Sequence, residues 1–181
     1  MLLLRHGSLP PVPQLTAEMG VKIDSRVLGD IDVIGKDFCL TFNLYTEKIN
    51  AGSRSGNILC FPSKTYPPPG TCMFSVYNKN GPLIIYHRFA KNRRESELTV
   101  TPKPHEWINL KITQMRTNVE PGEYKFKVLV NDVMESEMDL DESDLEDVRS
   151  VSVGLGRGIV GQLNNHVGLV HGLFVNGKQF L

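Results

Sequence analysis

Residues 107–132 constrain the fold of this chain more than any other segment, because apolar and polar residues alternate on both sides of a single turn. Every second position is apolar in residues 108–112 and again in residues 124–130. A period of two indicates half-buried β-strands. The Pro121-Gly122 pair between them favours a tight turn, because proline presets φ at the first central position and glycine accepts the positive φ of the second. The segment therefore predicts a β-hairpin with a short loop.

The rest of the chain continues as short apolar stretches separated by turn residues. Further strands are predicted at residues 21–28, 37–46, 57–61, 72–78, 83–89, 97–101, 134–138, 149–155 and 166–176. Residues 144–148 could form one helical turn, and no stretch has the period of an amphipathic helix. About ten short strands at this spacing are typical of a sandwich or barrel. We expect an all-β fold, an antiparallel two-sheet β-sandwich, because two facing sheets bury one-sided strands.

Length and charge limit the number of domains and the classes of partner. A chain of 181 residues favours one domain, expected at residues 21–181 after an extended, proline-containing arm at residues 1–20. Its 20 basic residues equal its 20 acidic residues, so it lacks the basic surplus that nucleic-acid binding needs. No apolar run approaches the roughly 18 residues of a membrane span. We therefore expect neither a nucleic-acid partner nor a membrane span.

The amino terminus and the cysteines bear on the compartment. The leucine run at residues 2–4 is too short for a signal peptide, so the chain is either made without a signal or trimmed from a longer one. We expect an extracellular or cell-surface location as part of a larger or processed chain, with a cytoplasmic location as the alternative. Cys60 and Cys72 could form a disulfide in an oxidising compartment. We favour the interpretation that they and Cys39 are small buried strand residues.

Four strand-like segments follow one another in an order that resembles the concanavalin A-like jelly-roll superfamily, which includes laminin G-like domains, pentraxins, legume lectins and galectins. They are residues 38–44, 107–112, 124–131 and 172–177. Each segment is common in antiparallel sandwiches, and their order and spacing carry the resemblance. It implies a jelly-roll sandwich from about residue 21 to the end. The function stays open, since the superfamily contains both binding proteins and enzymes.

The run Glu137-Met138-Asp139-Leu140-Asp141-Glu142 is the candidate for catalysis. It resembles the Glu-x-Asp-x-x-Glu run of jelly-roll β-glucanases, which implies one glutamate as nucleophile and one as acid about 5–5.5 Å apart. The run ends at residue 142 of 181, its flanks are acidic, and the chain has one tryptophan where sugar clefts use several aromatic side chains. The same carboxylates could bind Ca²⁺, although the run lacks EF-hand spacing. We expect a solvated connecting turn instead, with no catalytic residue, no metal site and no cofactor.

His87, Arg88, Asn92, Arg93 and Trp107 form the predicted ligand-binding site. The set resembles the galectin site, in which histidine, asparagine and arginine on adjacent strands bind galactose and a tryptophan stacks on the sugar. Asn92 and Arg93 fall in a charged loop, and the residues after Trp107 differ from the galectin pattern. The alternative is a surface loop beside a tryptophan at the edge of the core. For the basic residues of this stretch we favour contact with sulfated glycans or an acidic protein surface; they are Arg88, Lys91, Arg93 and Arg94.

These patterns favour non-catalytic recognition of a glycan or a protein surface, lectin-like or laminin G-like, as the function. The alternative is a structural or oligomerisation domain of a larger assembly. Edge strands and the proline-rich arm would then be the contact surfaces, and the partner could be a second copy of the chain. Glycoside hydrolysis is the third class, and it depends on Glu137 and Glu142.

Overall fold

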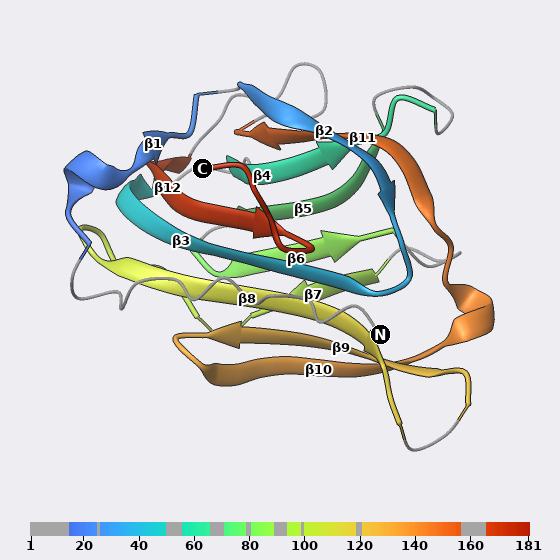
Figure 1. The fold of residues 1–181 in the computed structure, drawn as a ribbon. Coiled ribbons are helices and arrows are strands. Elements are labelled where there is room, and N and C mark those ends of the chain that lie inside the picture. Colours follow the sequence, from blue (N-terminus) through green and yellow to red (C-terminus); the bar gives the residue numbers. More distant parts are fainter. Residues whose placement is uncertain are drawn as a thin grey trace.

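The protein is a sandwich of two antiparallel β-sheets, as the ribbon shows (Figure 1). The computed structural model describes residues 15–24, 26–49, 56–65, 71–78, 81–88, 94–98, 100–118, 121–156 and 166–181. Its strands are β1 (Val21–Lys22), β2 (Val27–Ile34), β3 (Phe38–Ile49), β4 (Gly56–Pro62), β5 (Cys72–Asn78), β6 (Leu83–His87), β7 (Arg94–Glu97), β8 (Trp107–Arg116), β9 (Glu123–Val130), β10 (Val133–Asp141), β11 (Val148–Leu155), β12 (His166–Val175) and β13 (Lys178–Gln179). Two short 3-10 turns are η2 (Ala17–Met19) and η3 (Glu142–Asp144). The predicted all-β sandwich is confirmed.

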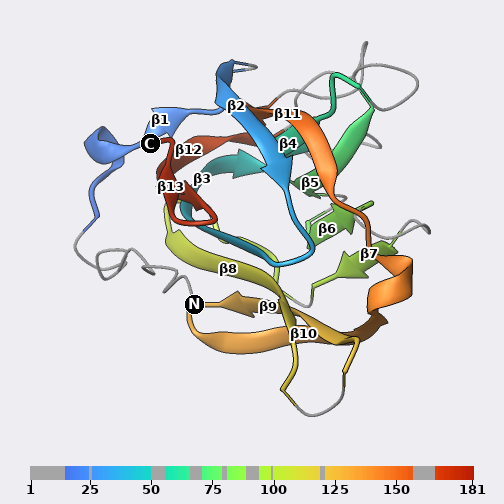
Figure 2. The same ribbon diagram turned by 45° about the vertical axis from the view of Figure 1, so that its right-hand side comes forward.

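Each sheet combines consecutive strands with strands that are distant in the sequence. Within the described residues, the seven-stranded sheet has the order β1-β12-β3-β8-β9-β10, with β13 paired to β12. The six-stranded sheet has the order β2-β11-β4-β5-β6-β7. The view turned by 45° shows the two layers facing each other, with β2 and β11 in one layer and β12 and β3 in the other (Figure 2). Four strand ends meet at one end of the six-stranded sheet: the end of β4, the start of β5, the end of β6 and the start of β11.

The β8–β9 hairpin confirms the prediction made from residues 107–132. Leu110 pairs with Val130 near one end of the hairpin, and Arg116 pairs with Tyr124 at the other. Along both strands, buried residues alternate with partly exposed ones. Gly122 in the connecting turn has a φ of +85°, a conformation that side chains with a Cβ rarely adopt. The turn therefore needs a glycine at this position.

An aromatic cluster lies in the core between the two sheets. Phe38 of β3 contacts Phe61 of β4 and Phe74 of β5, and the three ring centroids are 5.3 to 6.4 Å apart. All three side chains are fully buried. Burial of a side chain of this size contributes roughly 1.5–3 kcal/mol. The cluster therefore holds the two sheets together close to the end of β4.

One predicted strand is wrong. The sequence predicts a single strand at residues 21–28, whereas β1 belongs to the seven-stranded sheet and β2 to the six-stranded sheet. The chain crosses from one layer to the other between them, at a bend where Asp24 and Arg26 form an ion pair. Edge strand β2 also carries exposed Asp30 and Asp32, which hide its strand pattern in the sequence.

Two further elements lie earlier in the chain than predicted. The helical turn expected at residues 144–148 is η3, because the Asp141 carboxylate accepts a hydrogen bond from the Ser143 backbone N–H at 2.7 Å and caps the turn there. The strand expected at residues 97–101 is β7, which pairs with β6 and ends at Glu97.

The predicted amino-terminal arm, residues 1–20, is described from Leu15 onward, and its first 14 residues lie outside the described ranges. The described part contains η2. No helix in these ranges is long and apolar enough to cross a membrane.

Candidate functional site

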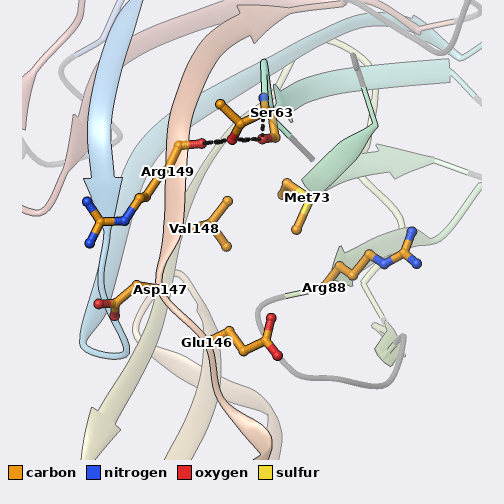
Figure 3. A pocket seen from close by; sticks show the side chains of 8 residues that line it. Ser63, Met73, Arg88, Glu146, Asp147, Val148 and Arg149 are labelled. Atoms are coloured by element: carbon orange, nitrogen blue, oxygen red, sulfur yellow. Dashed lines mark hydrogen bonds between the residues drawn. The ribbon is translucent and has the colours of Figure 1, made fainter. Parts of the chain in front are cut away.

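A pocket of about 220 Å³ opens at the end of the six-stranded sheet where four strands begin or end (Figure 3). Ser63 and Thr65 follow β4, Arg88 follows β6, and Val148 begins β11. The lining residues are Ser63, Thr65, Met73, Arg88, Glu146, Asp147, Val148 and Arg149. We call this site the rim pocket. It combines residues from four separate parts of the sequence.

Backbone hydrogen bonds fix the walls of the rim pocket. The Ser63 N–H donates to the Thr71 carbonyl oxygen at 2.9 Å and so joins the chain after β4 to the start of β5. The Arg88 N–H donates to the Met73 carbonyl oxygen at 2.7 Å and joins the end of β6 to β5. These bonds extend the β4–β5 and β5–β6 pairing just beyond the ends of β4 and β6.

Two hydroxyl groups line one wall. The Ser63 Oγ and Thr65 Oγ1 hydroxyls both donate to the Arg149 carbonyl oxygen at 3.3 Å, and the two hydroxyl oxygens are 3.4 Å apart. Thr65 is exposed, whereas Ser63 is buried. A hydroxyl that donates one hydrogen bond keeps acceptor capacity on its oxygen. The exposed Thr65 hydroxyl can therefore accept a hydrogen bond from a ligand without giving up its own.

The floor of the rim pocket is apolar. Met73 and Val148 are almost fully buried, and both belong to the main hydrophobic core. In the close-up their side chains lie between the hydroxyl wall and the Glu146 side chain (Figure 3). An apolar ligand surface placed on this floor would leave water and contact the edge of the core.

Charged groups surround the opening. Glu146 is exposed and Arg88 is half-buried. Figure 3 shows the Glu146 side chain on the side of the pocket where Arg88 lies, while the head groups of Asp147 and Arg149 extend away on the other side of β11. The Arg88 guanidinium extends away from Met73 and Val148 (Figure 3), so the carboxylate of Glu146 is the charged acceptor that ligand hydroxyls on the floor would meet.

The predicted site residues do not form one cluster. His87 is fully buried between the sheets and stacks on Phe126, with ring centroids 4.3 Å apart and the planes 18° from parallel. It therefore presents no surface to a ligand. Arg88 lines the rim pocket. Asn92 and Arg93 lie outside the described residues.

Trp107, the remaining predicted residue, lies on the outer face of the opposite sheet. It pairs with Tyr45 across β8 and β3, and their ring centroids are 5.2 Å apart. The His171 ring of β12 approaches it edge-on at 6.5 Å. The backbone at Gly20 also passes close, since a Cβ added to Gly20 would lie 3.1 Å from the Trp107 ring. Trp107 is thus half-buried by neighbouring aromatic rings and by the segment before β1, and it is separate from Arg88.

The acidic run is divided between a strand and a turn. Glu137 and Asp139 lie on β10 and form ion pairs with Lys125 of β9 at 3.1 and 2.6 Å. Glu142 begins η3 and forms ion pairs with Arg116 and Lys36 instead. The carboxylates that the β-glucanase pattern would pair are thus each neutralised by basic side chains.

These ion pairs keep the carboxylates ionised. Hydrogen bonds from Lys127 and Lys125 lower the pKa of Glu137, and a hydrogen bond from Arg116 lowers the pKa of Glu142. A general acid needs the opposite shift, because it must hold its proton near neutral pH. Among the residues that the structure describes, no three His, Cys, Asp or Glu side chains are grouped closely enough to hold a metal ion.

Sequence reasoning missed most of the rim pocket. Ser63, Thr65, Met73 and Glu146 belong to no recognisable motif. The available signal was positional, because polar residues directly after a strand gather at a sheet edge when their strands are neighbours. That signal becomes usable once the strand order is known.

Neither a protein-family model nor a curated protein matches the sequence. Solved structures do match the fold. Domains LG4-5 of the mouse laminin α1 chain are 14% identical with a TM-score of 0.57, over 88% of this chain and 42% of that chain. Endo-β-1,4-glucuronan lyase from the fungus Trichoderma reesei is 12% identical with a TM-score of 0.56, over 82% of this chain and 74% of that chain. A heptameric SAP-like pentraxin from Limulus polyphemus is 12% identical with a TM-score of 0.54, over 83% and 68%.

At this level of identity the likeness concerns the fold alone. The fold occurs in an enzyme, the lyase, as well as in the laminin and pentraxin domains, so it does not decide whether this chain is catalytic. The predicted resemblance is confirmed at the level of architecture: the chain has the concanavalin A-like jelly-roll fold.

Proposed function

We propose that the protein is a non-catalytic recognition domain that binds a glycan in the rim pocket. The composition of the pocket carries the proposal: an apolar floor of Met73 and Val148 lies beside a hydroxyl and a carboxylate. A sugar ring has the same two properties, an apolar face of C–H groups and a rim of hydroxyls. A binding site for such a ligand needs a few placed polar groups on an otherwise apolar surface.

The volume of the pocket suits a small part of a glycan. At about 220 Å³ it is below the roughly 300–1,000 Å³ of sites for drug-sized ligands. It would hold one edge of a single sugar ring, since the nearly buried Met73 and Val148 offer only a small apolar surface. The hydroxyls of the ring would donate to the Glu146 carboxylate. The rest of a longer glycan would extend over the strand ends into solvent. We propose an extracellular or cell-surface location for such a function.

An array of neutral, acidic and sulfated glycans, read with and without calcium, tests the proposal. For a glycan that binds, calorimetry would compare Glu146→Gln and Thr65→Ala with the wild type. Loss of a hydrogen bond to a charged group costs about 1.5–3 kcal/mol, so Glu146→Gln should weaken binding roughly 10-fold or more. Glu106→Gln is the matched control, because Glu106 is an exposed glutamate outside the pocket. Binding that neither pocket variant weakens would contradict the rim-pocket site. Silence across the array would point to a protein ligand.

A second candidate function, assembly with further copies of the chain, is favoured by exposed apolar side chains at sheet edges. Val27 and Val33 are 44% and 40% exposed on β2, which ends the six-stranded sheet. Edge strands with exposed apolar residues are sites of strand addition. An oligomer would elute above the 20.3 kDa of one chain on a calibrated sizing column. The Val33→Asp variant should elute as a single chain, because the charge would disfavour contact between copies at this strand.

A further inference from the structure

An irregularity in strand pairing changes the face on which Cys72 lies. Phe61 of β4 pairs with Phe74 of β5, but the next pair joins Pro62 to Cys72, so Met73 is an extra residue in β5. Such an extra residue is a β-bulge. Because side chains alternate between faces along a strand, a bulge moves the residues beyond it to the opposite face. Cys72 therefore lies on the face opposite to Phe74.

Cys60 lies on that same face. Phe61 and Phe74 point into the core, so their neighbours Cys60 and Ser75, which pair with each other, point outward. A hydrogen bond from the Cys60 thiol, the largest influence, lowers the pKa of the Cys72 thiol although burial acts in the other direction. The Cys72 thiol itself donates to the Phe74 carbonyl oxygen, with Sγ 3.0 Å from that oxygen. Cys60 pairs with Ser75 and Cys72 pairs with Pro62, so the two cysteines lie diagonally on neighbouring strands, and neither forms a disulfide in this structure.

The two cysteines differ in burial. Cys72 is partly exposed, whereas Cys60 is 3% exposed. Thiol oxidation begins at a thiol that is both accessible and readily deprotonated, and a neighbouring thiol then completes a disulfide. Cys39 is unlike the pair, because it lies in the other sheet and burial raises the pKa of its thiol.

Cys72 also lies between two residues that hold the rim pocket. The carbonyl oxygen of Thr71, on one side of Cys72, accepts from the Ser63 N–H at 2.9 Å. The carbonyl oxygen of Met73, on the other side, accepts from the Arg88 N–H at 2.7 Å, and the Met73 side chain is the floor of the pocket. A movement of Cys72 toward Cys60 would therefore move the wall and the floor together.

We propose that Cys60 and Cys72 form a reversible disulfide that changes the shape of the rim pocket. The oxidant is a small disulfide such as oxidised glutathione. The Cys72 thiolate attacks one of its sulfurs, breaks its S–S bond and releases one glutathione thiolate. The Cys60 thiolate then attacks Cys72 Sγ in the mixed disulfide, forms the Cys60–Cys72 bond and releases the second glutathione. The two thiol protons end on the two released glutathione molecules, so two protein thiols are oxidised and one glutathione disulfide is reduced. Control of glycan binding by this bond rests on the function proposed above.

The first test needs no glycan. The full chain is treated with oxidised glutathione, its free thiols are counted, and the disulfide is located by peptide mass mapping. We expect the wild type to fall from three free thiols per chain to one, and to return to three with dithiothreitol. The Cys39→Ser variant, as control, should fall from two to none. Cys60→Ala and Cys72→Ala should each form no internal disulfide. Three thiols retained in the wild type, or a bond between two chains, would overturn the proposal.

The second test measures the pocket in the oxidised and reduced wild type. Hydrogen exchange at the Ser63 and Arg88 amides should change several-fold with oxidation, because both amides donate to the residues that flank Cys72. The Leu110 amide, in the other sheet, should exchange at the same rate in both forms. Unchanged exchange at Ser63 and Arg88 in a chain that has formed the disulfide would overturn the coupling to the pocket. A silent glycan array together with these shifts would reject the proposed function and leave the disulfide proposal standing.

Discussion

Glu142 joins three segments that are distant in the sequence. Its carboxylate forms ion pairs with Arg116 at the end of β8 and with Lys36 in the β2–β3 connection. Its backbone N–H donates to the Gly122 carbonyl oxygen in the β8–β9 turn at 2.7 Å. The run that resembled a catalytic motif thus fixes the corner at which β8, β9 and η3 meet.

Replacing Glu142 by glutamine should lower the stability at neutral pH and have little effect in acid. Arg116 lowers the pKa of the Glu142 carboxyl in the folded protein, so the unfolded chain binds the proton more tightly. The stabilisation is therefore complete above the unfolded pKa of about 4.3 and is lost as the pH falls through the lower folded value. Urea unfolding of wild type and Glu142→Gln at pH 7 and in acid, followed by Trp107 fluorescence, measures this difference.

The control for this experiment is Glu106→Gln, which changes an exposed glutamate. Its unfolding midpoint should match the wild type at both pH values. A Glu142→Gln deficit that stayed the same in acid would show that the carboxylate charge is not the source of the stabilisation.

Strand β9 shows how alternation divides one element between two environments. Phe126 is fully buried and stacks on His87, while the next residue, Lys127, forms an ion pair with Glu137 at 3.0 Å on the outer face. The buried ring contributes through packing and removal of apolar surface from water. The ion pair is solvated, and water screens it.

Truncating these two neighbours should therefore have unequal effects. Phe126→Ala should lower the free energy of unfolding by about 3–5 kcal/mol, because it removes a large side chain and leaves a cavity. Lys127→Ala should cost much less. Urea denaturation of both variants under the same conditions checks the ratio. Equal losses would mean that β9 does not face the core as described.

The strands with strict alternation were predictable, and the rim pocket was not. Residues 107–132 specify their own pairing, since the turn and both strands are contiguous. His87 ends a strand in which residues 83–86 are all apolar, so alternation could not tell which face it occupies. The bulge at Met73 has no sequence signature. The pocket needs strand ends that meet through sheet order, which no local pattern encodes.

At the whole-molecule scale, residues 178–180 cover the gap between β2 of one sheet and β12 of the other. The Phe180 ring packs against the core and lies close to Gly29 of β2, where an added Cβ would be 3.2 Å from it. Lys178 Nζ lies 5.0 Å over that ring and donates to the Asp30 carbonyl oxygen at 3.0 Å. The segment thus ties the edge strand of one sheet to the other sheet.

Phe180→Ala should lower the free energy of unfolding by weakening the contact between β2 and the other sheet. Because Phe180 is partly buried, we expect a loss of roughly 1–3 kcal/mol, below that of a fully buried phenylalanine. Uncovering β2 should also promote strand addition between copies, visible as earlier elution from a sizing column. Gln179→Ala, at the exposed neighbouring position, is the control and should elute with the wild type. Unchanged stability and elution for Phe180→Ala would contradict a closing role.

The stack of His87 on Phe126 gives the molecule an intrinsic NMR probe of the distance between its two sheets. The two rings belong to different sheets and lie nearly parallel, so the aromatic ring current of Phe126 displaces the imidazole proton resonances of His87. The chain has five histidines, and a displaced set of imidazole signals would be assigned by its loss in the Phe126 variant. A spectroscopist could then follow the separation of the two layers in real time, during unfolding or on ligand addition, without attaching a label.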